Sequence, residues 1–328
     1  MRKVLLTTTA LVALGGVTAA SALDISGWQR FEYSSWDDTA TTESGGNNDT
    51  RITDYNRVEF KHSITGDSGL NASGYYRINN WAEAYQDLTL SGDFGSVSVG
   101  NYTTAGGFMY NGHLYNGTFR SGTGQTFSGV STSAAAALAD GSTSAFGVTY
   151  SSPSVGGFST MLSYADAGTT SDADITEAFV AYAGSAGDMG FRVHGGFANS
   201  DDSTGTAGDE QENSEYGINL DTGGIGFRMT RAELTTKNTA GVSSSKIENN
   251  EYGLTYKASD DLTLGVIVLD SKDKLDTTNN PKLDMTVIAA NYFIMPGLRV
   301  QASTVDFDYE GATNNSGSSM NLALRIDF

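Results

Sequence analysis

The sequence predicts an all-β fold, a closed antiparallel β-barrel of sixteen strands that crosses a membrane. Three observations predict it. Segments of about ten residues alternate between apolar and polar side chains, tight turns alternate with long polar loops between them, and the number of segments is even. Such a barrel places both chain ends on one side and leaves no strand edge unpaired in lipid.

The first residues predict a cleaved signal peptide, residues 1–22. A basic start at Arg2 and Lys3 precedes an apolar stretch and an A-x-A cleavage pattern that ends at Ala22. Threonines and glycines interrupt the stretch, whereas a transmembrane helix needs about 20 apolar residues. Cleavage leaves a barrel domain, residues 23–328, of 306 residues (328 minus 22).

Each strand is predicted from a period of two in its side chains. The pattern is clearest at 225–229, 252–256 and 262–266, where apolar residues share one face and Gly, Thr or charged residues share the other. In chain order, the predicted strands span residues 24–36, 51–65, 70–78, 83–91, 96–101, 143–152, 158–165, 174–183, 189–198, 214–221, 225–233, 249–258, 262–270, 282–293, 298–307 and 318–328.

The connections fall into two classes that follow each other in turn. Because they alternate along the chain, the tight turns and the long loops are expected at opposite ends of the barrel. The turns are predicted at 66–69, 92–95, 153–157, 184–188, 222–224, 259–261 and 295–297, and the long loops at 37–50, 166–173, 199–213, 235–247, 271–281 and 308–317.

Other all-β folds explain the pattern less well. A β-sandwich buries its apolar faces against a second sheet and does not sort its connections by length. A solenoid repeats a sequence motif at a fixed period. In this chain strands and turns recur at regular intervals, but no sequence motif repeats with them. Aromatic side chains gather toward the strand ends, as in the girdles of membrane barrels. An apolar outer face surrounded by lipid is the arrangement that remains.

Composition excludes several classes of protein. Without Arg2 and Lys3, 17 basic residues oppose 38 acidic ones, a formal net charge of −21, so nucleic acid is not an expected partner. The chain has no cysteine, so no disulfide holds the exported fold. Beyond the signal peptide no apolar run reaches the length of a membrane helix.

Several segments resemble a known family. The stretch GDFGSVSVG at 92–100, the stretch FGVTYSSPSVGGFSTMLSYA at 146–165 and the terminal Phe328 are similar to the sixteen-stranded general diffusion porins of Gram-negative bacteria, particularly those of alphaproteobacteria. The resemblance implies a homotrimer in the outer membrane, in contact with its lipid and lipopolysaccharide. It also implies a passive, water-filled channel in each subunit and a third loop folded into the lumen.

One connection is longer than the others. The turns recur about every 30 to 40 residues, but about 60 separate 92–95 from Pro153, and the excess lies at about 102–142. A loop of this length is usually functional or disordered. The resemblance places it in the channel constriction. Its charged and titratable side chains are Asp140, Arg120 and His113, which we therefore expect at the constriction.

A basic wall is predicted on the lumenal side of the first three strands. Arg30, Arg57 and Arg77 belong to the polar set of their strands at mid-height, with Lys61 lower down. Clustered charge in a wet pore selects ions, and the related porins carry a basic cluster here that faces an acidic loop. The alternative is that these arginines pair with neighbouring glutamates and brace the wall.

Ion selectivity stays open at this stage. The long loop holds a single carboxylate, Asp140, so a strong transverse field is not expected. A second basic set lies near the turn ends of its strands, where it either lines the exit or, as we favour, avoids the lipid midplane, at which Arg costs about 2–4 kcal/mol. Its members are Arg192, Arg228, Lys257, Arg299 and Arg325.

Catalytic, metal and cofactor sites are not expected. His62, His113 and His194 are far apart and cysteine is absent, which argues against zinc. The motif that starts at Asp306 imitates a calcium loop but has Gly317 where a bidentate Glu is needed. Acidic loops could share divalent cations with lipopolysaccharide, although a solvated surface explains them better; they contain Asp201-Asp202 and Asp209-Glu210.

Three functions are compatible with the barrel. The leading one is a pore for passive diffusion of ions and small hydrophilic solutes. The second is a structural or adhesive barrel with a blocked lumen. The third, a membrane-embedded hydrolase, needs a Ser–His pair near the lipid-facing rim, to which His113 or His194 could contribute.

The last nine residues, MNLALRIDF, form the closing strand. Met320 to Phe328 by twos are apolar and face lipid, and the interleaved residues face the lumen. This strand must pair with the first to close the sheet. By the resemblance, Phe328 is the signal that the outer-membrane assembly machinery reads.

Overall fold

The computed structural model describes most of the barrel. Within the described ranges no helix is long and apolar enough to cross a membrane. The predicted signal peptide lies outside the described residues except for Ala22, which is the first residue of the first strand. The described residues are 22–38, 50–80, 82–100, 130, 146–166, 174–201 and 210–328.

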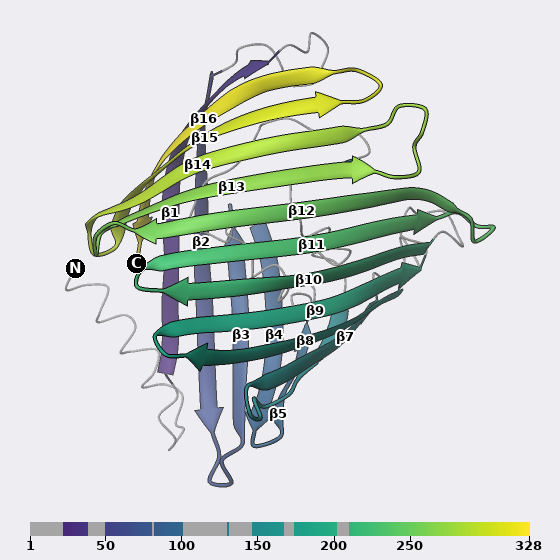
Figure 1. Ribbon diagram of the computed structural model, residues 1–328. Coiled ribbons are helices and arrows are strands. Elements are labelled where there is room, and N and C mark those ends of the chain that lie inside the picture. The colour runs from purple at the N-terminus through teal and green to yellow at the C-terminus, as the bar shows by residue number, and fades with distance from the viewer. Residues whose placement is uncertain are drawn as a thin grey trace.

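The sheet is a closed barrel of sixteen antiparallel strands, as predicted, in which each strand pairs with its neighbours in sequence and β1 also pairs with β16. Figure 1 shows β1–β4 on the far wall and β9–β13 on the near wall. The strands are β1 (Ala22–Asp38), β2 (Thr50–Thr65), β3 (Asn71–Asn79), β4 (Ala82–Gly92), β5 (Gly95–Gly100), β6 (Phe146–Ser151), β7 (Phe158–Asp166), β8 (Asp174–Ala186), β9 (Met189–Asp201), β10 (Glu210–Thr222), β11 (Ile225–Lys237), β12 (Ser243–Lys257), β13 (Leu262–Asp273), β14 (Lys282–Met295), β15 (Leu298–Glu310) and β16 (Asn315–Asp327).

The chain end closes the barrel. The backbone N–H of Gly27 donates to the Phe328 carbonyl at 2.9 Å, and the Phe328 N–H donates to the Gly27 carbonyl at 3.0 Å. The first and last strands therefore meet at the end of the barrel that carries the tight turns. Figure 1 shows the C-terminus on this side.

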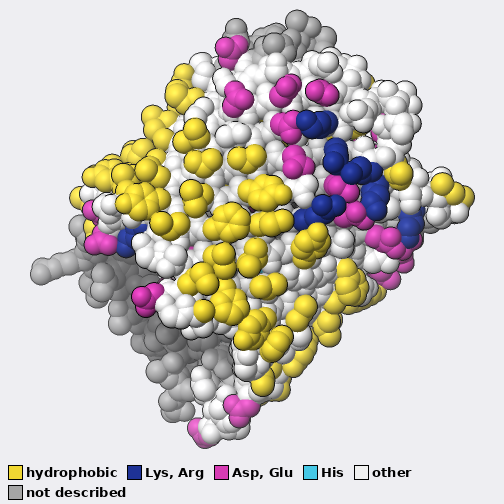
Figure 2. All heavy atoms as spheres, viewed as in Figure 1, with side chains coloured by type: hydrophobic (Ala, Val, Ile, Leu, Met, Phe, Trp, Pro, Cys, Tyr) yellow, Lys and Arg dark blue, Asp and Glu magenta, His cyan; other side chains and the backbone are white. Residues whose placement is uncertain are grey.

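The two faces of β16 differ as the alternation predicts. Met320, Leu322 and Leu324 are 52%, 47% and 47% exposed, whereas Asn321 and Ala323 are 2% and 1% exposed. The apolar set therefore faces outward and the interleaved set faces the lumen. Similar outward side chains form a broad apolar band across the near wall in Figure 2.

Strands extend farther toward the long loops than predicted. The segment 235–247 was predicted as a loop, but the ladder between β11 and β12 continues to the pair Lys237 and Ser243. The segment 308–317 shortens in the same way, since β15 ends at Glu310 and β16 begins at Asn315. Apolar alternation ends where lipid ends, but backbone hydrogen bonds continue above it, so sequence pattern underestimates these strands.

Part of the lumenal face is apolar, which corrects the prediction of a polar interior. A buried cluster on β13–β15, here called the inner apolar patch, includes Leu269, Leu283, Val287 and Val305, each 0% exposed, and Val130 packs against it. Runs such as Val266-Ile-Val-Leu269, apolar on both faces, are the sequence signal for it. The patch comprises Ile267, Leu269, Leu283, Met285, Val287, Ala289, Val305, Phe307 and Tyr309.

Candidate functional site

The candidate site is a group of cationic side chains on the lumenal face of β15, β16, β1, β2 and β3, here called the arginine wall. Strand register brings it together, since Arg30 lies opposite Arg325, Arg325 opposite Arg299, and Arg57 opposite Trp28. Paired residues in antiparallel strands point to the same face. The wall comprises Arg30, Arg57, Lys61, Arg77, Arg299 and Arg325.

Trp28 is the centre of the upper part of this wall. The guanidinium carbons of Arg30, Arg57 and Arg325 lie 5.2, 5.3 and 4.6 Å from its ring centroids. Arg30 also lies 4.6 Å from the ring of Tyr55. Stacking on an aromatic face holds a guanidinium in place while it keeps its charge.

Arg299 and Arg325 correct the prediction for the second basic set. Their positions near the turn ends of β15 and β16 suggested that they merely avoid the lipid midplane. The register instead places them beside Arg30, because β16 ends at the level of Gly27 while β1 starts five residues earlier, at Ala22. Stagger between strands, which single-strand counting ignores, causes the difference.

The lower part of the wall surrounds a recess of about 690 Å³. Arg57, Lys61 and Arg77 line it together. Arg77 is stacked 3.4 Å from the ring centroid of Tyr85, and the Lys61 ammonium lies 5.5 Å from that of Tyr75. The predicted quartet of Arg30, Arg57, Arg77 and Lys61 therefore occupies one continuous wall. Acidic side chains also line the recess, namely Asp24, Glu59 and Asp87.

Carboxylates also brace the wall, as the alternative reading expected. Arg30 lies 3.4 Å from Glu32, and Glu59 lies 3.7 Å from Arg57 and 3.3 Å from Lys61. On the neighbouring strands, Asp327 joins two arginines, with nitrogen–oxygen distances of 3.2 Å to Arg299 and 2.6 Å to Arg325. Ion pairing and a pore-lining position thus coexist in these residues.

The three predicted loop residues, Asp140, Arg120 and His113, lie outside the described residues. His194 does not fit the hydrolase hypothesis, because it is 4% exposed on the lumenal face of β9 rather than at a lipid-facing rim. Its Nε2 atom lies 3.4 Å from Glu215. Among the described residues no group of three or more His, Cys, Asp or Glu is placed to hold a metal ion.

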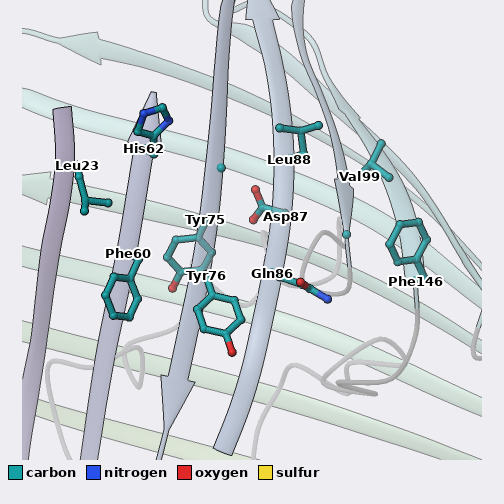
Figure 3. A pocket seen from close by; sticks show the side chains of 12 residues that line it. Leu23, Phe60, His62, Tyr75, Tyr76, Gln86, Asp87, Leu88, Val99 and Phe146 are labelled. Carbon is teal, nitrogen blue, oxygen red and sulfur yellow. The ribbon is translucent and has the colours of Figure 1, made fainter. Parts of the chain in front are cut away.

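The outer side of the same wall carries a hollow of about 570 Å³. Figure 3 shows side chains of β2, β4 and β5 around it, with Phe60, Leu88 and Val99 beside the polar groups of His62 and Gln86. The hollow exists because Gly74 has no side chain there. A Cβ added at this glycine would have only the carbonyl oxygen of Asp87, at 4.0 Å, nearby.

Trp28 is the residue of the candidate site that sequence reasoning missed. The signal was present, because Trp28 precedes Arg30 by two residues and therefore shares its lumenal face. It is also one of only three tryptophans in the chain. A large aromatic residue within a polar, pore-facing set is a candidate platform for cationic side chains.

Comparisons with known proteins agree with this architecture. A family model described as Gram-negative porin matches residues 7–312. No curated protein sequence matches. Among solved structures, an anion-selective porin from Comamonas acidovorans has a TM-score of 0.72 at 13% identity, with 94% of this chain and 100% of that chain covered.

Two structures of OmpT, an outer membrane protein of Vibrio cholerae, are similar as well. The outer-membrane expressed form has a TM-score of 0.68 at 16% identity, covering 95% of this chain and 99% of that one. The in-vitro folded trimer form has a TM-score of 0.67 at 16% identity, covering 94% and 100%. At such identities the likeness shows a shared fold.

A closed sixteen-stranded barrel with an apolar outer band and a charged lumenal wall defines an integral channel protein of the outer membrane. The matching family model identifies the family to which this channel protein belongs. The chain belongs to the Gram-negative porin family, and it forms an outer-membrane channel for passive diffusion.

Proposed function

We propose that the arginine wall lines the narrowest part of the channel and favours the passage of small anions. The observation that carries the proposal is the convergence of Arg30, Arg57 and Arg325 on the Trp28 ring. Charge fixed at a constriction sets which ions pass. The channel needs no cofactor for this, and no catalytic step takes part.

The balance of charge along the wall supports a preference for anions. Within the described part of the chain, the six cations of the wall lie beside five carboxylates, so cationic groups exceed carboxylates by one; the carboxylates are Glu32, Glu59, Asp327, Asp24 and Asp87. Stacking keeps the guanidinium groups at the wall while they retain their charge. Carboxylates and phosphates of small solutes suit such a surface.

Reversal potentials across planar bilayers test the proposal. We expect Arg57→Ala to shift the reversal potential toward cation selectivity, and Arg57→Lys to shift it less because the charge remains. Arg231→Ala, at an arginine on the outer face, is the matched control and should leave selectivity unchanged. Equal reversal potentials in wild type and Arg57→Ala would contradict the role of the wall. A folded but silent barrel would instead favour the structural or adhesive alternative.

We also propose that the long connection 102–142 folds into the lumen and docks on the inner apolar patch. The contact of Val130 with this patch supports the proposal. Exposing an apolar face to water inside the channel costs about 25 cal/mol per Å², so a segment that covers this patch stabilises the fold. Val130 is the residue of this connection that the structure describes.

A charge placed on Val130 tests the docking. Val130→Asp should weaken the contact and raise single-channel conductance, because an ion in an apolar interface is costly. Val242→Asp, at a valine that is 60% exposed between β11 and β12, makes the same exchange outside the lumen and should leave conductance as it is. Unchanged conductance in Val130→Asp would argue against the docking.

We further propose a homotrimer that assembles through the outer side of β1–β4. Four polar side chains alternate with lumenal residues there and so face outward, where hydrocarbon does not accept amide or imidazole groups without cost: Gln29, Asn56, His62 and Gln86. A protein neighbour accepts them. One of the similar structures is described as a trimer form.

Two glycines allow a matched test of this interface. Gly74→Trp would fill the outer hollow on β3, and we expect monomers by native mass spectrometry because the partner could no longer seat. Gly195→Trp places the same side chain on the outer face of β9, across the barrel, and should leave trimers intact. Trimers in both variants would place the interface elsewhere.

A further inference from the structure

The recess of about 690 Å³ in the lower part of the arginine wall carries equal numbers of opposite charges. Three cations and three carboxylates line it, namely Arg57, Lys61 and Arg77, and Asp24, Glu59 and Asp87. The single excess positive charge of the wall therefore lies among its other members, above the recess. A solute with one sign of charge gains little from a balanced recess, whereas a solute that carries both signs can contact both.

Strand register keeps these opposite charges apart. One lumenal row crosses four strands, with Asp24 on β1 opposite Lys61 on β2, Lys61 opposite Tyr75 on β3, and Tyr75 opposite Asp87 on β4. Figure 3 shows Tyr75 and Asp87 on their neighbouring strands. The Lys61 ammonium lies 5.5 Å from the Tyr75 ring centroid. The row therefore sets an aromatic residue between the cation of β2 and the carboxylate of β4.

The carboxylates of the recess are engaged to different degrees. Glu59 serves two cations, at 3.3 Å from Lys61 and 3.7 Å from Arg57, so these two can accept one further carboxylate. Asp87 is partly buried and accepts a hydrogen bond of 3.3 Å from the Thr89 hydroxyl, but within the described ranges it has no ion-pair partner. Removing a carboxylate from water without a cation costs free energy, which a bound ammonium group would offset.

We propose that this recess binds small zwitterionic solutes of the amino acid class. The solute's ammonium group would contact Asp87, its carboxylate would contact Lys61 and Arg57, and its carbon chain would lie on the Tyr75 ring. Lys61 is accessible to such a solute, since its side chain is 52% exposed.

The spacing of the strands limits the size of the solute. Lys61 on β2 and Asp87 on β4 are two strand spacings apart, or about 10 Å. An ion-pair contact takes up about 3 Å at each end, which leaves about 4 Å between the two charges of the solute. A short amino acid has that separation. The inference rests on the proposed function only in that both require the arginine wall to face a water-filled lumen.

Single-channel recordings of the purified full-length barrel test the proposal with three probes of similar size, namely β-alanine, propionate and propylammonium. β-Alanine has no net charge, so a bound molecule should obstruct chloride and lower the conductance in a saturable way. We expect it to half-saturate at a lower concentration than either singly charged probe. In Asp87→Asn this concentration should rise roughly 10- to 100-fold, because one charge-assisted contact is lost. Asp221→Asn removes a lumenal carboxylate across the barrel and should behave like wild type.

A second variant keeps the test valid if Asp87→Asn fails to fold. Lys61→Met leaves Glu59 its partner Arg57 and gives the recess a net negative charge, so β-alanine should bind more weakly and propylammonium more strongly. Equal effects of β-alanine and propionate on wild type, or unchanged β-alanine binding in both variants, would overturn the proposal. If the reversal potential in KCl alone still favours anions, such a result refutes the zwitterion site and leaves the role of the arginine wall intact.

Discussion

Trp28 shows how one residue can organise a charged surface in water. Three guanidinium groups around a single indole would repel one another if they were free to move. Stacking offsets part of this repulsion by about 0.5–1 kcal/mol for each exposed cation–π contact, and Asp327 offsets more of it between Arg299 and Arg325. The positions of the charges are therefore fixed by an aromatic ring together with paired acids.

Replacing the ring should disperse the charges. We expect Trp28→Leu to increase open-channel current noise and to move the reversal potential toward zero, because the arginine side chains regain rotamer freedom. Trp36→Leu exchanges a tryptophan on the same face of the same strand, away from these arginines, and is the matched control. Identical noise and selectivity in the two variants would mean that Trp28 does not position the arginines.

At the scale of the strand, β16 combines closure with a place in the pore. Its outward residues face lipid, Phe328 directly after it forms the seam with Gly27, and its Arg325 belongs to the arginine wall. A side chain at Gly27 would clash, because an added Cβ would lie 2.2 Å from the Arg57 carbonyl oxygen. The close approach of β1 to β2 beside the seam therefore requires a glycine at this position.

Deleting Phe328 should impair assembly. The deletion removes both hydrogen bonds to Gly27 at the seam and the terminal aromatic, so we expect less heat-resistant folded barrel on gels after refolding. Arg325→Ala is the contrasting change and should leave assembly intact, since Asp327 keeps Arg299 as its partner. Normal yield of folded barrel without Phe328 would show that the seam tolerates its loss.

At the scale of the molecule, two opposing sets of charge act on an ion. The chain carries 38 acidic residues against 19 basic ones, and this excess of negative charge attracts cations toward the mouths. The arginine wall attracts anions farther in. Screening limits each to about 10 Å at 0.1 M salt, so the nearer charges dominate inside the pore.

Acid should separate these two contributions. Carboxylates titrate near pH 4 and arginines do not titrate in this range, so lowering the pH from 7 to 3.5 removes negative charge and leaves the wall cationic. The reversal potential should shift toward anions. At 1 M salt the shift should shrink because screening tightens to about 3 Å. A shift toward cations at low pH would contradict this account.

The sequence by itself determined the number of strands, their order, the turns and the lipid-facing side of each strand. Those features follow from local rules, because the alternation of side chains in a strand and the Gly- or Asp-rich composition of a turn can each be recognised within one short stretch of sequence. The same rule also identified Arg30, Arg57, Arg77 and Lys61 as lumenal. The sequence could predict the lumenal position of these four side chains because successive residues of one strand point to opposite faces of the sheet.

Only the tertiary structure decided which residues share a level of the barrel. Arg325 meets Arg30 and Trp28 because β1 starts below the end of β16, and this stagger depends on pairings between the two ends of the chain. The same holds for the inner apolar patch, whose partner Val130 lies more than a hundred residues away in sequence. Strand parity is local in the chain, whereas register and loop docking come from long-range packing.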